Sequence, residues 1–262
     1  MTSIGIQGET QLRVAICGKL AVEAGTLTLL ERDFPARQGR RLWCYLVLER
    51  RRSVSRDELA EALWGDDAPD EWDASLSAVA SRLRSTLKPV AAHVPGVEVT
   101  SDAGGYRLQL PSDAFIDFER ARYGLHLAES AVSHADVSTA LSEGRVALEI
   151  AARGFLPGDG LPWVELRRRQ LRDIQIHAAE CLAESELHRN EPLRAEREAE
   201  QLLMIDPLNE TGYRVRMRAA AALGNRAGVM RAMTQCRELL SSIAGMAPSQ
   251  ETEWLFRELT GT

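Results

Sequence analysis

The fold is decided by the stretch Ser53-Val54-Ser55-Arg56-Asp57-Glu58-Leu59-Ala60-Glu61-Ala62-Leu63-Trp64-Gly65. Ser55 and Glu58 match the S-x-x-E capping box, in which the two side chains satisfy free backbone N–H groups at the start of a helix. Leu59, Ala62 and Leu63 follow at helical spacing and form one apolar face. The stretch therefore predicts a short amphipathic helix that buries this face against neighbouring elements.

The flanking sequence predicts further short elements on both sides of this helix. A helix over 38–51 is too apolar all round to be anything but buried. A third helix is expected from Asp73, a suitable N-cap, to Leu87, because Pro89 follows. Strands are expected at 12–17, 20–23 and 26–29, and a hairpin is expected over 97–110 with its turn at 102–105.

Three helices that are flanked by strands and closed by a hairpin predict an α+β winged helix over residues 12–110, whose working part is the third helix. On a helical projection one face is apolar and the opposite face is small and polar. Arg82 and Arg84 flank that outer face, which suits close approach to a DNA groove. A surface helix with solvated arginines fits the same pattern equally well. The inner face is Leu76, Val79, Ala80, Leu83 and Leu87, and the outer face is Ala74, Ser77, Ala78, Ser81 and Ser85.

After Pro111 the pattern changes to helical spacing throughout, and no further strand is expected. Short breaks between the helices predict consecutive antiparallel pairs, and Leu193 and Val229 open equivalent helices at close to the tetratricopeptide period. The sequence therefore predicts an all-α, tetratricopeptide-like helical domain over residues 114–262. Its helices are expected at 116–131, 136–152, 163–188, 192–205, 210–223, 226–244 and 250–259.

The composition restricts the class of protein. The 262 residues include 32 basic and 38 acidic side chains, a net charge of −6. Neither half of the chain has an excess of basic residues, so binding to nucleic acid would need a local basic patch. No apolar run reaches membrane-spanning length, and the N-terminal residues show neither the basic start nor the apolar core of a signal peptide, so we expect a cytoplasmic protein without a membrane partner. The 4 cysteines are far apart and are expected to be buried, reduced thiols.

Catalytic and metal-binding motifs are missing from the sequence. Cys17-Gly18-Lys19-Leu20 lacks the upstream glycine and the Ser or Thr of a phosphate-binding loop. The 5 histidines have no metal-like spacing. We therefore expect no enzymatic activity, no metal and no cofactor.

Several motifs together resemble those of one family. Residues 38–64, Ser81-Arg82-Leu83-Arg84 and Gly105-Tyr106-Arg107-Leu108 resemble an OmpR/PhoB-type winged helix. The second half resembles the bacterial transcriptional activator domain at Asp206-Pro207-Leu208-Asn209-Glu210, Cys236-Arg237-Glu238-Leu239-Leu240 and Pro248-Ser249-Gln250-Glu251-Thr252. In this order, the motifs over about residues 12–260 are similar to those of small members of the antibiotic regulatory protein (SARP) family.

The resemblance implies a DNA-binding activator of a specialised-metabolite (antibiotic) gene cluster. Family members bind direct repeats in promoters and recruit RNA polymerase, so the implied partners are double-stranded promoter DNA, RNA polymerase holoenzyme and a second copy of the chain on DNA. Carried over by position, Trp64 would contact the DNA backbone, Arg84 a phosphate, and Tyr106 and Arg107 belong to the wing; the residues facing the major groove would be Ser77, Ala78, Ser81 and Arg82. Trp64 and Tyr106 have an alternative interpretation as core aromatics.

Two features depart from the family pattern. Wings of the family carry an arginine shortly before Gly-Tyr-Arg, where this chain has Thr100-Ser101-Asp102-Ala103. The outer face of the third helix is also rich in Ala and Ser. Two other functions therefore stay open: a protein-interaction module whose winged helix binds DNA weakly or not at all, and a ligand sensor.

An acidic loop precedes the third helix. The resemblance implies that it contacts the polymerase, with Trp72 as an anchor. The alternative is a solvated turn whose negative charge favours the start of the helix. The residues assigned to the polymerase contact are Asp66, Asp67, Asp70, Glu71 and Trp72.

Overall fold

The computed structural model describes residues 11–102 and 104–261, except for the side chain of Asp102. The chain divides into two compact units. The N-terminal unit combines residues up to Phe118 with Arg153–Arg168. The helical unit combines Glu119–Ala152 with the residues from Arg169 onward. Arg153–Arg168, which we call the docked segment, therefore packs with residues that precede it by a hundred positions or more.

A small four-stranded sheet opens the N-terminal unit, in the order β3-β2-β1-β7. The three strands predicted near the N-terminus are confirmed as β1 (Arg13–Ala15), β2 (Ala21–Ala24) and β3 (Leu27–Leu30). The fourth strand, β7 (Phe115–Ile116), pairs in parallel with β1 and corrects the prediction that no strand follows Pro111. With only two residues, β7 is too short to show an alternating pattern, and its pairing with a strand a hundred positions earlier leaves no local signal.

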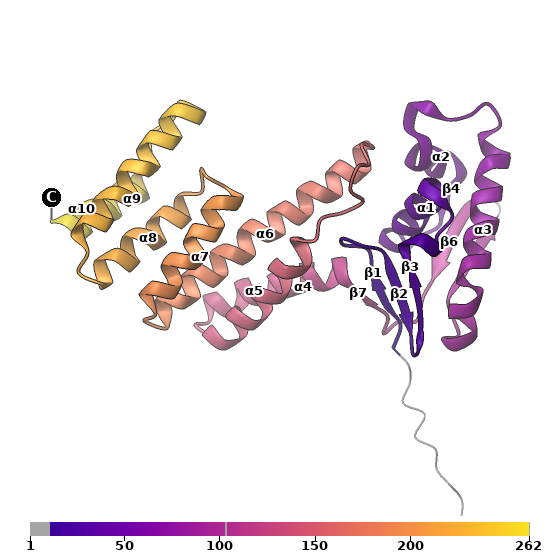
Figure 1. The fold of residues 1–262 in the computed structure, drawn as a ribbon, viewed down its shortest axis with the longest axis horizontal. Helices are drawn as coiled ribbons and strands as arrows, with labels where there is room; N and C mark the ends of the chain where they lie inside the picture. Colours follow the sequence, from indigo (N-terminus) through magenta and orange to yellow (C-terminus); the bar gives the residue numbers. More distant parts are fainter. Residues whose placement is uncertain (1–10, 103, 262) are drawn as a thin grey trace, which may run out of the picture. The chain divides into compact units, whose positions relative to one another are not determined.

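The predicted winged-helix topology is confirmed in the rest of this unit. Leu59, Leu63, Leu76 and Leu83 are fully buried and join the helices in one core. The wing strands form a second sheet in the order β4-β6-β5, and α3 runs beside the hairpin of β5 and β6 (Figure 1). The elements are α1 (Ala36–Leu48), β4 (Val54–Ser55), α2 (Arg56–Trp64), α3 (Trp72–His93), β5 (Glu98–Asp102) and β6 (Gly105–Gln109).

The third helix is longer than predicted. It begins at Trp72 and continues through Pro89 to His93, whereas the sequence predicted an end at Leu87. Leu87 and Val90 are both buried, so packing holds the helix on either side of the proline. Pro89 itself is exposed, so water can satisfy the carbonyl that its missing N–H leaves free. The predicted N-cap is also wrong: Glu71 occupies that position and makes no side-chain cap.

The helical unit consists of antiparallel helices, and the predicted boundaries hold within a few residues. Figure 1 shows α7, α8 and α9 as successive helices side by side. Small residues form the interface of α7 with α8, among them Ala195, Ala199 and Ala219, so these two backbones approach closely. The helices that lie wholly or partly in this unit are α4 (Asp117–Ser133), α5 (Val137–Ala151), α6 (Pro162–His188), α7 (Pro192–Ile205), α8 (Glu210–Ala222), α9 (Arg226–Leu239) and α10 (Gln250–Thr260).

Side-chain caps explain why these helices begin where the sequence predicted. Asp136 accepts from the backbone N–H of Thr139, and Asn209, Asn225 and Ser249 accept in the same way at the starts of α8, α9 and α10. The helix predicted to reach Ala244 changes at Leu240 into one π-helical turn. Gly245, at φ 63°, ends that turn in the left-handed conformation that glycine adopts readily.

Candidate nucleic-acid interface

The exposed face of α3 is the one predicted from the sequence. Ser77, Ala78, Ser81 and Arg82 are all exposed, while Leu76, Ala80, Leu83 and Leu87 are buried. The Arg82 side chain makes no ion pair within the described residues. A narrow row of small side chains beside one unpaired guanidinium group can approach a groove closely and still offer hydrogen-bond donors.

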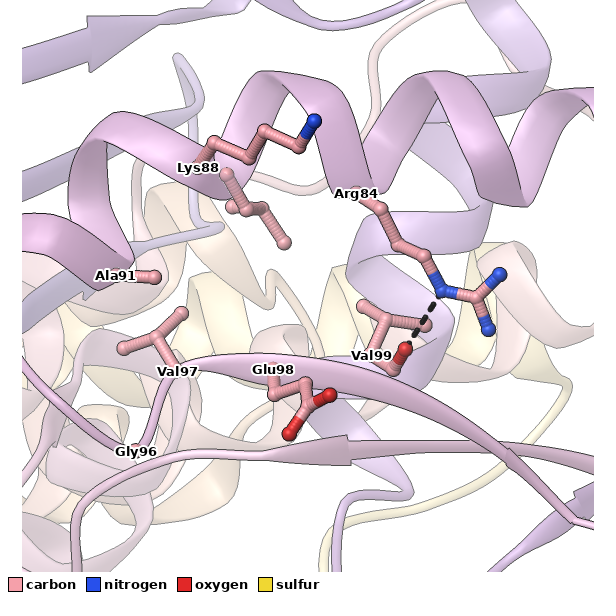
Figure 2. Close-up of a pocket in the computed structure, with 8 residues that line it drawn as sticks. Arg84, Lys88, Ala91, Gly96, Val97, Glu98 and Val99 are labelled. Carbon is pink, nitrogen blue, oxygen red and sulfur yellow. Dashed lines mark hydrogen bonds between the residues drawn. The ribbon is translucent and has the colours of Figure 1, made fainter.

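Arg84 is less free than its predicted outward position suggests. It is half-buried, and its Nε donates to the main-chain oxygen of Val99 in β5 at 2.7 Å. Figure 2 shows this bond at one side of a cavity of about 420 Å³, with Lys88 one turn further along α3. The two terminal nitrogens of Arg84 point away from the Val99 oxygen, so they can still reach a phosphate while Nε holds the wing.

Tyr106 is a core residue of the wing, as its alternative interpretation predicted. Its side chain is 3% exposed, so its ring cannot lie against DNA. The guanidinium groups of Arg56 and Arg84 each lie 5.4 Å from the centre of the ring. Tyr106 therefore acts on this surface indirectly, since it orients two cations. Arg107, the next residue, is exposed.

Arg56 is the functional candidate that the sequence did not single out. It is the first residue of α2, and its Nε lies 2.5 Å from Asp73 Oδ1 at the start of α3. Its terminal nitrogens also donate to Ser77 Oγ at 2.8 Å and to the Tyr106 hydroxyl at 3.0 Å. The signal that could have found it is an arginine directly after the capping serine, but pairing with Asp73 17 positions later leaves no local pattern.

Trp64 is half-buried at the end of α2. It lines a cavity of about 530 Å³ together with Tyr45 and with Trp163 of the docked segment. Trp163 packs edge-on against Tyr45 and donates from Nε1 to the main-chain oxygen of Ala62 at 2.9 Å. Trp64 thus shares its surroundings with the docked segment, and a DNA contact would involve only its open side.

The acidic loop is exposed and unpaired. Asp66, Asp67, Asp70 and Glu71 are exposed, and none of them makes an ion pair with another described residue. Trp72 is half-buried at the first position of α3. Asp73 differs from the other four carboxylates, because it pairs with Arg56. Four free carboxylates next to the exposed face of α3 repel phosphate and can attract a basic protein surface.

The wing is a regular antiparallel hairpin in which Ser101 faces Tyr106 and Asp102 faces Gly105. The side chain of Asp102 and all of Ala103, which carry the departure from the family's arginine, lie outside the described residues. Within the described part of the chain, no group of three His, Cys, Asp or Glu side chains could hold a metal ion. No described helix combines the length and apolarity needed to cross a membrane.

Two family descriptions match the chain. Residues 36–108 match "transcriptional regulatory protein, C terminal", and residues 116–260 match "bacterial transcriptional activator domain". Two curated relatives are named regulatory protein AfsR. The one from Streptomyces coelicolor is 29% identical over 211 residues, which are 80% of this chain and 20% of that protein. The one from Streptomyces griseus is 26% identical over 247 residues, which are 92% of this chain and 24% of that protein.

The chain thus spans a quarter or less of the length of these relatives. Among solved structures, Mycobacterium tuberculosis EmbR in complex with a low-affinity phosphopeptide matches with a TM-score of 0.80 at 21% sequence identity. The match covers 97% of this chain and 66% of that one. It confirms the predicted fold, a winged helix followed by a tetratricopeptide-like helical region.

Proposed function

Since the chain belongs to the SARP family of transcriptional activators, with an OmpR/PhoB-type winged helix and a bacterial transcriptional activator domain, we propose that it binds duplex promoter DNA through the exposed face of α3. The observation that supports this most is Arg82. It is exposed and free of ion pairs within the described chain, and it lies beside Ser77, Ala78 and Ser81. Arginine is the side chain that most often reads guanine in the major groove.

The contacts divide into two kinds. Arg82 would reach a base edge, while the terminal nitrogens of Arg84, the exposed Arg107 and the open side of Trp64 would contact the backbone. Because one short face reads few bases, two copies of the chain on direct repeats would supply the remaining specificity. The controlled genes would be those of a specialised-metabolite cluster, as the family resemblance implies.

The acidic loop supports a second part of the proposal, recruitment of RNA polymerase holoenzyme. The exposed carboxylates of Asp66, Asp67, Asp70 and Glu71 offer no benefit to a DNA contact, but they suit a basic protein surface next to the promoter. Trp72, half-buried at the edge of this loop, would add an aromatic anchor.

One observation favours a different function, a protein-interaction or ligand-sensing regulator that binds DNA weakly. On the exposed face of α3, Ser77, Ala78 and Ser81 are small and uncharged. Arg84 is committed to the wing, because its Nε donates to the main-chain oxygen of Val99. The two functions differ in their dependence on salt. Binding to DNA releases counterions and weakens steeply as salt rises, whereas binding to polymerase without DNA would weaken far less.

Two experiments test the proposal. Selection from a random-sequence duplex pool, followed by titration at several salt concentrations, shows whether the chain binds specific DNA. A genome-wide map of the protein in its own cells then shows whether those sites lie at promoters of a biosynthetic cluster. Failure to enrich any duplex would exclude the DNA-binding function. Binding of the chain to RNA polymerase in the absence of DNA would support the protein-interaction function.

A further inference from the structure

Arg56 lies where α2, α3 and the wing meet, and nearly all of its donors are used. Nε pairs with Asp73 Oδ1 at 2.5 Å. The terminal nitrogens donate to the main-chain oxygen of Asp73 at 2.9 Å, to Ser77 Oγ at 2.8 Å and to the Tyr106 hydroxyl at 3.0 Å. Ser77 is on the exposed face of α3, so the guanidinium group borders the surface proposed to meet DNA.

The two partners of this ion pair are unequally exposed. The side chain of Arg56 is 29% exposed, whereas that of Asp73 is 64% exposed. The Asp73 carboxylate pairs only with Arg56 within the described residues, but Arg56 keeps three other acceptors when that carboxylate is removed. The arginine is therefore held in place without the carboxylate, and the carboxylate can be displaced without disordering the arginine.

We propose that Asp73 competes with a DNA phosphate for Arg56, so that a backbone phosphate takes the place of the Asp73 carboxylate in the DNA complex. This inference rests on the proposed DNA-binding function and adds to it one phosphate contact and one built-in opposing charge. An exposed ion pair contributes little net stability, so displacement is feasible. The displaced carboxylate remains close to the phosphate and lowers the affinity.

The competition also changes the salt dependence. In the parent protein Arg56 is already neutralised by Asp73, so exchanging the carboxylate for a phosphate releases almost no net counterions. Without the carboxylate the same phosphate contact would steepen the plot of log affinity against log salt by about 0.9 units. A purely structural ion pair that only joins α2 to α3 would leave this slope unchanged.

The test compares Asp73→Asn with Asp70→Asn in titrations of a duplex selected by the parent protein from a random-sequence pool. Asp70 is a matched control, because it is an exposed carboxylate of the acidic loop without an ion pair to a described residue. Asp73→Asn should bind about two- to fivefold more tightly at low salt, which is the factor expected for one exposed ion pair. Its plot of log affinity against log salt should also be steeper than that of the parent. Asp70→Asn should change the affinity less and leave the slope as in the parent.

The same substitution is repeated in an Arg56→Gln background, where Asp73→Asn should have no more effect than Asp70→Asn. Thermal unfolding of each variant is measured, and Asp73→Ser, which also removes the charge, replaces Asp73→Asn if the amide lowers the melting temperature. Equal effects of the two aspartate substitutions, or weaker binding by a stable Asp73 variant, overturn the inference while DNA binding itself stands. A parent protein that selects no duplex removes the function and the inference together.

Discussion

Arg41 and Asp159, 118 positions apart in the sequence, form a buried, bidentate ion pair. Nε of Arg41 lies 2.7 Å from Oδ2 of Asp159, and a terminal nitrogen of Arg41 lies 2.8 Å from Oδ1. Both side chains are 7% exposed. Arg41 also donates to the main-chain oxygen of Leu63 at the end of α2, next to the Ala62 oxygen that Trp163 binds. The docked segment thus secures the end of the helix from which the acidic loop begins.

Asp159→Asn should therefore destabilise the protein strongly. Removing one partner of a buried ion pair leaves the other charge uncompensated, which costs about 3–5 kcal/mol in the free energy of unfolding. Asp113→Asn is the control, because Asp113 is exposed and its carboxylate pairs with no described residue. Urea unfolding of both variants measures the difference, and equal stabilities would mean that the ion pair contributes nothing.

The same pair predicts a dependence on pH. Burial opposes ionisation of Asp159, but the hydrogen bond and the charge of Arg41 outweigh it and lower the pKa of the carboxyl below its usual value. A lowered pKa in the folded state stabilises the protein fully above the unfolded-state pKa of about 4 and loses that effect as the pH falls through the folded value. The stability difference between parent and Asp159→Asn should shrink below about pH 4 and stay constant above it.

Arg84→Ala should weaken DNA binding nearly equally on all sequences and flatten the salt slope by about one unit, as expected for a phosphate contact. It should also lower the melting temperature, because the Val99 oxygen loses its Nε donor and the wing loses its link to α3. Lys88→Ala removes a charge from the exposed position one turn further along and should leave stability unchanged. If Arg84→Ala changes stability alone, the residue only holds the wing.

Neutralising the acidic loop should separate DNA binding from activation. Changing Asp66, Asp67 and Asp70 to Asn and Glu71 to Gln leaves Asp73 in its ion pair. DNA affinity should be unchanged or slightly higher, since four charges that repel phosphate are gone. Transcription from a target promoter should nevertheless fall sharply. Activation equal to the parent's would place the recruitment surface elsewhere.

Trp72→Ala tests the anchor in the same loop. Because Trp72 is half-buried, its loss should lower activation and reduce stability moderately, so thermal unfolding is measured with the reporter assay. If the variant is less stable but its folded fraction activates transcription as well as the parent, Trp72 only contributes to packing.

The four thiols should react slowly in the folded protein. Burial raises the pKa of Cys17 and Cys44 well above its ordinary value, that of Cys181 to about 12 and that of Cys236 to about 11. The thiolate is the reactive form, so a thiol reagent at pH 8 should label them only after unfolding. Fast labelling of any one cysteine in the native protein would show that its surroundings open.

Local patterns predicted most of the fold. The capping serine at Ser55, the caps of the helical unit and the alternation in the wing are short-range signals, and the elements that follow them are confirmed. The orientation of α3 followed from helical spacing in the same way. Contacts between distant segments were not predictable: the pairing of β7 with β1 and of Asp159 with Arg41 has no trace in the local sequence.

In the candidate site too, local features were predictable from the sequence and contacts between distant segments were not. The outward position of Arg82 was predicted, because it depends only on the register of one helix. Spacing alone does not reveal how the wing and α2 pack against α3. The hydrogen bond from Arg84 to Val99, the burial of Tyr106 and the position of Arg56 all depend on that packing.

The proposed reading of DNA by the exposed face of α3 depends chiefly on Arg82, so the decisive measurement is the affinity of Arg82→Ala for a duplex selected by the parent. Arg197→Ala, an exposed arginine on α7 of the helical unit, is the matched control. Arg82→Ala should lose about 1–3 kcal/mol of specific binding, with the melting temperature and the control unchanged. An Arg82→Ala protein that binds the selected duplex as tightly as the parent would show that this face of α3 does not read DNA.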